Sequence, residues 1–156
     1  MLKWLVAAVI VVALDQATKL AADHWLMFHQ PVPVMPFFNL TLSYNPGAAF
    51  SFLADHSGWQ RSFFTFLALV GSVFLIRWLH QIGNRDRWLS ASIALVLGGA
   101  VGNLIDRLAY GHVIDFIQLY YRNWSWPVFN VADIAITLGV IGLIAHMLFN
   151  PEAREA

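Results

Sequence analysis

Four long apolar stretches dominate this chain of 156 residues and limit what it can fold into. A helix of about 20 apolar residues crosses the roughly 30 Å hydrocarbon core of a bilayer. The stretches predict membrane spans at residues 4–24, 59–78, 88–108 and 128–149. We therefore expect residues 1–156 to form one integral membrane domain built on four transmembrane helices.

The composition agrees with a bilayer protein and excludes several other classes. Hydrophobic residues make up 59% of the chain and charged residues 12%, whereas soluble chains carry about 25% charged residues. The formal net charge of zero gives no basic surface for nucleic acid. The chain has no cysteine, which excludes a disulfide, a thiol nucleophile and a thiolate metal site.

Tryptophan residues bracket the predicted spans, as interfacial aromatic rings do. Trp4 and Trp25 are 21 residues apart, and Trp59 and Trp78 are 19 apart. At about 1.5 Å per helical residue these separations are about 32 and 29 Å, the thickness of one bilayer. The alternative is that the rings fill a protein core.

The orientation is predicted from the basic residues of the short loops. With the N-terminus inside, the outer loops hold Arg61 and Arg122, while Lys19 and Arg107 lie at outer helix ends. The positive-inside rule then favours two cytoplasmic termini. The first apolar run is interpreted as a retained helix, because polar residues stand where a signal cleavage site would have small ones. The inner side would receive Lys3, Arg77, Arg85, Arg87 and Arg154.

The loop at residues 26–58 is expected to carry a small extracytoplasmic β element. Prolines favour an extended chain in its first part. Residues 39–44 alternate polar and apolar side chains, which predicts a strand, and residues 45–47 predict a turn. A second strand is expected at residues 113–120, which are rich in β-branched and aromatic residues. The fold class is thus an all-α membrane protein with a small β cradle.

Polar residues in or beside the spans are expected at one depth, near the outer surface. Such residues are costly in a membrane, so they are candidates for function. With the termini inside, the first and third spans end at the outer face and the fourth span begins there. The connection between the third and fourth spans lies at the same face, so the whole set is expected there. The set comprises Asp15, Lys19, Asn103, Asp106, Arg107, Asp115, Asn130 and Asp133.

Several of these residues also have purely structural interpretations. Asp15 and Lys19 are i,i+4 neighbours and form either an ion pair within one helix or part of a site. Asn130 either caps the fourth helix or belongs to the site. Close helix packing is expected at three small residues of the third span, Gly98, Gly99 and Gly102.

Asp115 and Asp133 are the candidate catalytic pair. They lie 18 residues apart on the two sides of a short connection that can bring them together. Two carboxylates in a dry site share a proton, so that one activates water and the other polarises a scissile carbonyl. Alternatively, Asp133 forms a salt bridge to Arg107 and Asp115 is a solvated loop residue. Arg107 could otherwise be an interfacial anchor or a counter-ion to Asp106 or Asp115.

Other activities are less well supported by the residues. No serine has the neighbouring Lys or His pattern that a nucleophile needs. A proton-coupled transporter or channel could use Asp15, Asp115 and Asp133 as a relay, but the inner halves of the spans hold almost no ionisable groups. A noncatalytic assembly subunit is the third possibility. A zinc site is not expected, because helical ligand spacing is lacking among His24, His29, His56, His80, His112 and His146.

Five segments of the chain form a set: DQATK at 15–19, NPGAAF at 45–50, GGAVGNLIDR at 98–107, GHVIDF at 111–116 and FNVAD at 129–133. In this order they resemble the signature motifs of bacterial lipoprotein signal peptidase, also called signal peptidase II. Any one of these motifs is a weak signal, whereas the third and the last two together are specific. The similarity extends over residues 15–133 and agrees with the length and the four spans.

The resemblance implies an aspartyl endopeptidase of the bacterial inner membrane that removes signal peptides from diacylglyceryl-modified prolipoproteins. Cleavage would fall on the N-terminal side of the lipidated Cys, with Asp115 and Asp133 as the catalytic dyad near the outer face. No metal or organic cofactor is implied, and we expect a monomer in contact with membrane lipid. Supporting roles around the pocket are implied for Asp15, Lys19, Asn45, Gly47, Asn103, Arg107 and Asn130.

Overall fold

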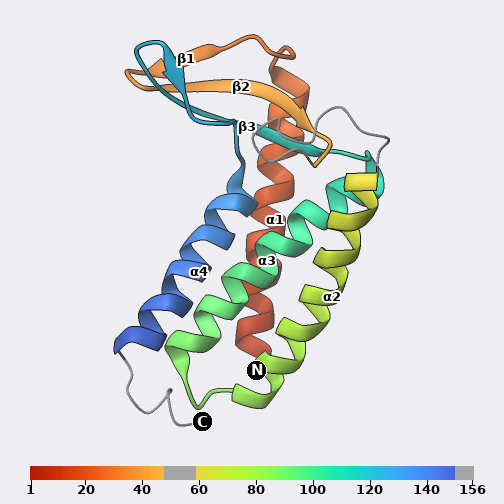
Figure 1. Ribbon diagram of the computed structural model, residues 1–156, viewed down its shortest axis with the longest axis vertical. Helices are drawn as coiled ribbons and strands as arrows, with labels where there is room; N and C mark the ends of the chain where they lie inside the picture. The colour runs from red at the N-terminus through yellow and green to blue at the C-terminus, as the bar shows by residue number, and fades with distance from the viewer. Residues whose placement is uncertain (48–58, 150–156) are drawn as a thin grey trace.

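Four helices and a four-stranded sheet make up the computed structural model, which describes residues 1–47 and 59–149. The sheet lies across one end of the helix bundle, while Met1 and the last turn of α4 lie at the other end (Figure 1). The helices are α1 (Leu2–Trp25), α2 (Trp59–Ile82), α3 (Arg87–Ala109) and α4 (Val131–Phe149). The strands are β1 (Val32–Met35), β2 (Phe38–Asn45), β3 (Val113–Tyr121) and β4 (Trp124–Ser125).

All four helices are long and apolar enough to cross a bilayer, and α3 is the central one. It packs against α1, α2 and α4. In the 18-residue apolar stretch of α3, 56% of the residues are buried, compared with 11–22% in the other three helices. The outer surfaces of α1, α2 and α4 are therefore free to face lipid. The core between α1, α2 and α3 is apolar and includes Ala8, Leu75, Leu79, Ile93 and Leu97.

The predicted arrangement of four apolar helices with a small β element is confirmed, with shifts at some helix ends. α2 continues past the predicted residue 78 to Ile82, where Gly83 adopts a φ of 60°. α4 begins at Val131 rather than at residue 128. The delay has a local cause, because Phe129 forms a bridge with Ile117 of β3 and Asn130 caps the helix.

The sheet is antiparallel, with the strand order β1-β2-β3-β4. Both predicted strands are present, as β2 and β3, and each is slightly longer than expected. Sequence patterns did not predict β1 or β4. β1 contains Pro33, which is tolerated because β1 is an edge strand. The register pairs Ser43 with Asp115 and Asn45 with Val113, so two distant segments lie side by side.

Two glycines of α3 allow its close contact with the neighbouring helices. A Cβ atom on Gly98 would lie 2.7 Å from Cβ of Val11 in α1. A Cβ atom on Gly99 would collide with the backbone oxygen of Ala132 and lie 2.7 Å from Cγ1 of Ile136, both in α4. The predicted role of these small residues in helix packing is confirmed.

We expect Gly99→Ala to destabilise the bundle by about 1–3 kcal/mol, because the added methyl group must push α4 away from α3. Gly71→Ala in α2 is the matched control, since a Cβ atom there meets nothing within 4 Å. Thermal unfolding in detergent should show a lower Tm for Gly99→Ala than for Gly71→Ala. Equal Tm values for the two variants would refute the close α3–α4 contact.

Candidate active site

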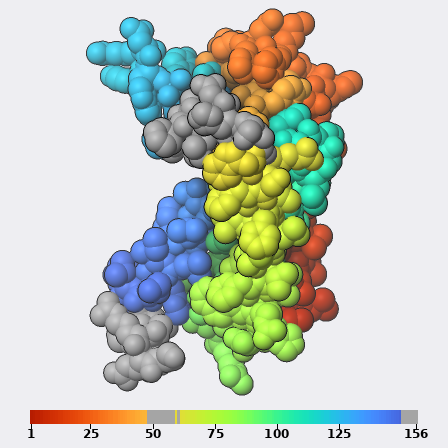
Figure 2. Space-filling view, turned by 45° about the vertical axis from the view of Figure 1, so that its right-hand side comes forward, coloured from red at the N-terminus to blue at the C-terminus, as the bar shows by residue number. Residues whose placement is uncertain are grey.

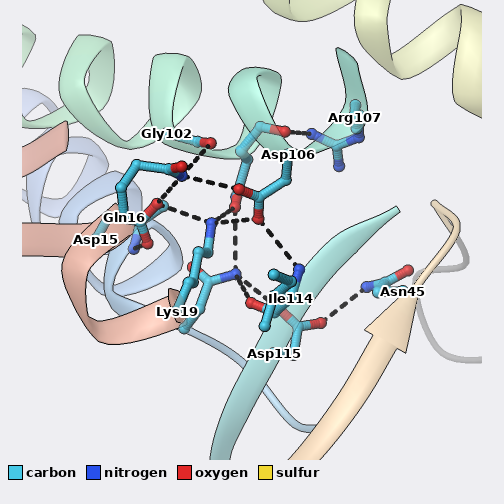
Figure 3. A network of polar contacts seen from close by, with 12 residues as sticks. Asp15, Gln16, Lys19, Asn45, Gly102, Asp106, Arg107, Ile114 and Asp115 are labelled. Atoms are coloured by element: carbon cyan, nitrogen blue, oxygen red, sulfur yellow. Dashed lines mark hydrogen bonds and ion pairs between the residues drawn. The ribbon is translucent and has the colours of Figure 1, made fainter. Parts of the chain in front are cut away.

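A cluster of buried polar side chains lies where the bundle meets the sheet (Figure 3). Its members come from α1, α3, β3 and the start of α4, and all are at most 6% exposed. The predicted convergence of these groups at one end of the bundle is therefore found in the structure. The buried members are Asp15, Lys19, Asn103, Asp106, Asp115 and Asn130.

The Lys19 ammonium is the centre of this cluster. It lies 2.8 Å from Oδ2 of Asp15 on its own helix and 2.9 Å from Oδ2 of Asp106 on α3. It also donates a hydrogen bond of 2.8 Å to Oδ1 of Asn103. All three ammonium hydrogens can thus be used, at a side chain that is 1% exposed. The ion pair within α1 exists as predicted, and the same lysine also joins α1 to α3.

The two carboxylates around Lys19 hold further elements through their other contacts. Oδ1 of Asp15 accepts a 2.8 Å hydrogen bond from the backbone N–H of Ala132 in α4. Asp106 accepts hydrogen bonds from the backbone N–H of Ile114 at 3.1 Å and from Nε2 of Gln16 at 2.8 Å. α1, α3, α4 and β3 are therefore tied together through two carboxylates.

Gly102 has a second role in addition to the helix packing expected for it. A Cβ atom at this position would lie 2.5 Å from Oδ2 of Asp15. Its backbone oxygen accepts a 3.2 Å hydrogen bond from Nε2 of Gln16. The absence of a side chain on Gly102 therefore makes room for a buried carboxylate as well as for a helix.

Asn130 and Asp133 form a capping box at the start of α4. Oδ1 of Asn130 accepts from the backbone N–H of Asp133 at 3.0 Å, and Oδ2 of Asp133 accepts from the backbone N–H of Asn130 at 3.2 Å. Nδ2 of Asn103 donates a 2.8 Å hydrogen bond to the other Asp133 oxygen. The predicted cap is present, and it also fixes the position of the Asp133 carboxylate.

The same Asn130 side chain links Asp133 to Asp115. Nδ2 of Asn130 donates a 2.6 Å hydrogen bond to Oδ1 of Asp115 on β3. Nδ2 of Asn45, at the end of β2, lies 3.2 Å from the other Asp115 oxygen. The two aspartates of the candidate pair are thus held through one shared asparagine. The pairing of β2 with β3 places Asn45 beside Asp115, which lies 70 residues away in the sequence.

Asp115 is 3% exposed, so it is not the solvated loop carboxylate of the alternative interpretation. Burial, followed by the charge of Asp133, raises the pKa of the Asp115 carboxyl to about 7. The hydrogen bonds from Asn45 and Asn130 act in the opposite direction and lower it. Asp115 consequently exchanges its proton near neutral pH.

Arg107 lies beside the cluster and forms no close ion pair with its carboxylates. Nη1 donates to the backbone oxygen of Asn103 at 3.2 Å, and the guanidinium carbon lies 5.6 Å from the ring centre of Phe64. Within residues 1–47 and 59–149 no carboxylate lies within 4.0 Å of this guanidinium. The alternative interpretations that pair Arg107 closely with Asp106, Asp115 or Asp133 are therefore not supported, and Arg107 acts on those charges only at longer range.

The turn after β2 is present as predicted over residues 45–47. Oδ1 of Asn45 accepts a 2.9 Å hydrogen bond from the backbone N–H of Gly47, and Gly47 adopts a φ of 113°. This positive φ favours glycine. The rest of that motif, residues 48–50, lies outside the described residues. Asn45 therefore uses its carbonyl oxygen for the turn and its amide for Asp115.

The family resemblance assigned no supporting role to Gln16 or Asp106, although Asp106 belongs to the polar set predicted at the outer face. Both are fully engaged in the cluster, since Nε2 of Gln16 contacts Asp15, Gly102 and Asp106. Gln16 lies between the two charged residues of the first motif, and Asp106 follows Asn103 by one helical turn. Their polarity at membrane depth was the available signal.

No group of three or more His, Cys, Asp or Glu side chains in the described part of the chain is arranged to hold a metal ion. The candidate site is instead a hydrogen-bonded network of carboxylates, amides and one ammonium. Carboxyl groups in such a network can donate and accept protons.

The fold and the site are those of a multi-pass membrane enzyme. Two solved structures, each described as a bacterial membrane enzyme determined by the in meso method, are similar to it. The one at 2.3 Å resolution has a TM-score of 0.82 at 32% identity, covering 95% of this chain and 88% of its own. The one at 1.9 Å resolution has a TM-score of 0.83 at 31% identity, covering 96% and 95%.

The sequence profile of the family described as signal peptidase (SPase) II matches residues 7–149. A lipoprotein signal peptidase of Acinetobacter baumannii is 50% identical over 97% of this chain and 86% of its own length. Lipoprotein signal peptidases of Pseudomonas syringae pv. tomato and Coxiella burnetii are 49% and 46% identical, over 99% and 97% of this chain and 90% and 93% of their own lengths. The chain belongs to the signal peptidase II family and is a peptidase.

We expect Lys19→Met to destabilise the protein by about 3–5 kcal/mol, because it leaves Asp15 and Asp106 buried without their cation. Lys3→Met is the matched control, since Lys3 is exposed near the N-terminus, where its ammonium lies over the Trp4 ring. Chemical unfolding in mixed micelles measures the difference. A Lys19→Met variant as stable as Lys3→Met would show that the ammonium does not hold the cluster together.

Proposed function

We propose that this chain is an aspartyl endopeptidase that removes the signal peptide from diacylglyceryl-modified prolipoproteins, cutting on the N-terminal side of the lipidated Cys. One observation carries the mechanism. Asp115 and Asp133 come from a strand and a helix, and the side chain of Asn130 donates to the Asp115 carboxylate and accepts from the backbone N–H of Asp133. The family and the names of its relatives support the substrate class.

The two carboxyl groups have environments suited to different roles. Burial and the charge of Asp133 raise the pKa of Asp115 to about 7, so about half of the molecules carry its proton at neutral pH and can donate a hydrogen bond to the scissile carbonyl oxygen. Asp133 accepts hydrogen bonds from Asn103 and from the backbone of Asn130, which leaves it as the base that activates water. Water would attack the carbonyl carbon as Asp133 takes its proton, and the leaving amine would receive a proton from the pair.

The position of the pair suits a substrate anchored in the membrane. A signal peptide is an apolar helix, so its cleavage point emerges at the bilayer surface. Figure 2 shows a hollow between α2 and α4, which both pack on α3, below the end of the molecule that carries the sheet. The diacylglyceryl group can stay in lipid beside these helices while the peptide bond reaches the carboxyl groups.

We infer that the end of the molecule that carries the sheet faces outward. Met1 lies at the end away from the sheet, as do the loop between α2 and α3 and the end of α4 (Figure 1). The basic residues Lys3, Arg77, Arg85 and Arg87 belong to that end, and the positive-inside rule places it in the cytoplasm. The carboxylate pair then lies near the outer face of the bacterial inner membrane.

An apolar core, which lies between the carboxylate cluster and the opposite end of the bundle, argues against a proton relay across the bilayer. Between the cluster and the opposite end, the buried side chains of α1, α2 and α3 form the apolar core described above. The next ionisable pair, His146 and Asp86, joins the far ends of α4 and α3. A relay needs ionisable groups along the whole path, so a peptidase accounts better for a cluster at one end.

We expect Asp115→Asn and Asp133→Asn each to lower kcat for a lipid-modified prolipoprotein by about 100-fold or more, because each removes one proton-transfer group. Asp23→Asn is the matched control. Asp23 lies at the same end of α1, where it accepts a hydrogen bond from the Tyr44 hydroxyl, and it belongs to no contact of the pair. Gel-resolved cleavage in micelles measures all three variants, with Tm confirming that each is folded.

Full activity in folded Asp115→Asn or Asp133→Asn would refute the assignment of these two residues as a catalytic dyad and favour a noncatalytic role for them. Loss of activity in Asp23→Asn to the same degree would show that the assay reports on fold or charge instead.

We expect activity to fall as the pH rises through about 7, by about tenfold per pH unit at higher pH, because Asp115 loses the proton that the carbonyl oxygen needs. Asn45→Ala should move this alkaline limb to higher pH, since the Asn45 hydrogen bond lowers the pKa of Asp115. The pH dependence of kcat/KM measures both effects. A limb that stays in place in Asn45→Ala would contradict Asp115 as the proton donor.

A further inference from the structure

A groove outside the carboxylate cluster combines two guanidinium groups with an apolar wall. It lies between the start of α2 and the end of α3 and has a volume of about 390 Å³. α3 contributes Arg107 and Leu108, and the remaining lining comes from one face of α2. The α2 residues are Arg61, Ser62, Thr65, Phe66 and Leu69.

The α2 wall of this groove changes from charged to apolar within about two helical turns. Arg61, Thr65 and Leu69 follow each other at i,i+4 spacing, so they line one stripe of the helix. Arg61 is the last charged residue before fifteen residues, 62–76, that carry no charge. The apolar end is open to the surroundings, since Phe66 is 66% and Leu108 58% exposed. The groove therefore crosses the boundary between headgroups and hydrocarbon.

Neither guanidinium group forms a close ion pair among residues 1–47 and 59–149, where no carboxylate lies within 4.0 Å of Arg61 or Arg107. The charges of Asp106, Asp115 and Asp133 act on Arg107 only at longer range. Nε of Arg107 is buried and has no hydrogen-bond partner there. Arg61 lies against the turn after α3, where a Cβ atom on Gly111 would come within 3.0 Å of its Nη1. Two cations held at the edge of the hydrocarbon favour an anion from the membrane.

We infer that this groove binds the phosphodiester of an anionic phospholipid, with one acyl chain along Phe66, Leu69 and Leu108. The planar guanidinium groups match phosphate oxygens in geometry, and the hydroxyls of Ser62 and Thr65 supply further donors. A diacylglyceryl group without phosphate would satisfy only the apolar wall. The bound lipid is therefore a different molecule from the proposed substrate, and this inference does not depend on the proposed function.

The test is native mass spectrometry of the full chain in detergent, titrated with dioleoyl phosphatidylglycerol. Dioleoylglycerol, with the same chains and no phosphate, and inorganic phosphate are the comparison ligands. We expect retention of one phosphatidylglycerol, weaker retention of dioleoylglycerol, and no displacement by millimolar inorganic phosphate. Equal retention of the two lipids would overturn the phosphate contact, and displacement by inorganic phosphate would show a site for the free ion.

Variants separate the groove from general attraction of anions. Arg61→Gln should weaken phosphatidylglycerol binding about tenfold, because it removes a charge-assisted contact. Thr65→Val, which keeps the side-chain shape, should weaken it about threefold. Arg122→Gln is the matched control, since Arg122 lies in the turn between β3 and β4 and its guanidinium lies 5.4 Å from the Tyr121 ring centre. Binding that is unchanged in Arg61→Gln, or equally weakened in Arg122→Gln, overturns the site.

The outcome is independent of peptide cleavage. Arg61 makes no contact with the carboxylate cluster, so Arg61→Gln should cleave a prolipoprotein in lipid-free detergent at the wild-type rate. Normal cleavage with lost lipid binding supports the groove. Lost cleavage in folded Arg61→Gln with unchanged lipid binding would place Arg61 in the peptidase site and overturn the inference.

Discussion

The buried ammonium of Lys19 is the interaction on which the arrangement of this protein depends. A charge that is 1% exposed inside a membrane bundle is tolerable only if it is paired and fully hydrogen-bonded. Lys19 meets this condition with partners on two helices, and those partners in turn accept backbone N–H groups of α4 and β3. One cation therefore fixes three helices and a strand relative to one another.

This pairing also divides the four aspartates of the cluster into two kinds. Asp15 and Asp106 both lie within ion-pair distance of Lys19 and share its single positive charge. In the described part of the chain Asp115 has no cation at that distance and depends on amide donors. A carboxyl group that is buried beside another carboxylate retains its proton up to a higher pH. The contacts of Lys19 thus leave Asp115 as a carboxyl group that titrates near neutrality.

Local patterns predicted much of this structure, because periodicity reports which face of an element is buried. The four spans, the strands at 39–44 and 113–120 and the Asp15–Lys19 pair all follow from spacings of a few residues. Contacts across the sequence have no such signal. The register that brings Asn45 to Asp115, and the reach of Lys19 to Asp106, arise only when separate elements pack. Gly102 was likewise interpreted as a packing residue because no spacing shows a carboxylate above it.

The start of α4 explains why such a site forms at the end of the bundle and not at its middle. The first N–H groups of a helix have no partner within the helix, so they can bind carboxylates and amides. Here the Asp15 carboxylate accepts a hydrogen bond from the backbone N–H of Ala132. The side-chain oxygen of Asn130 accepts one from the backbone N–H of Asp133. Farther along α4 those donors belong to the helix itself. Only at this end can β3, which lies outside the bundle, also bring Asp115 to the Asn130 amide. A site made of two aspartates from a helix and a strand is therefore confined to the depth at which α4 begins.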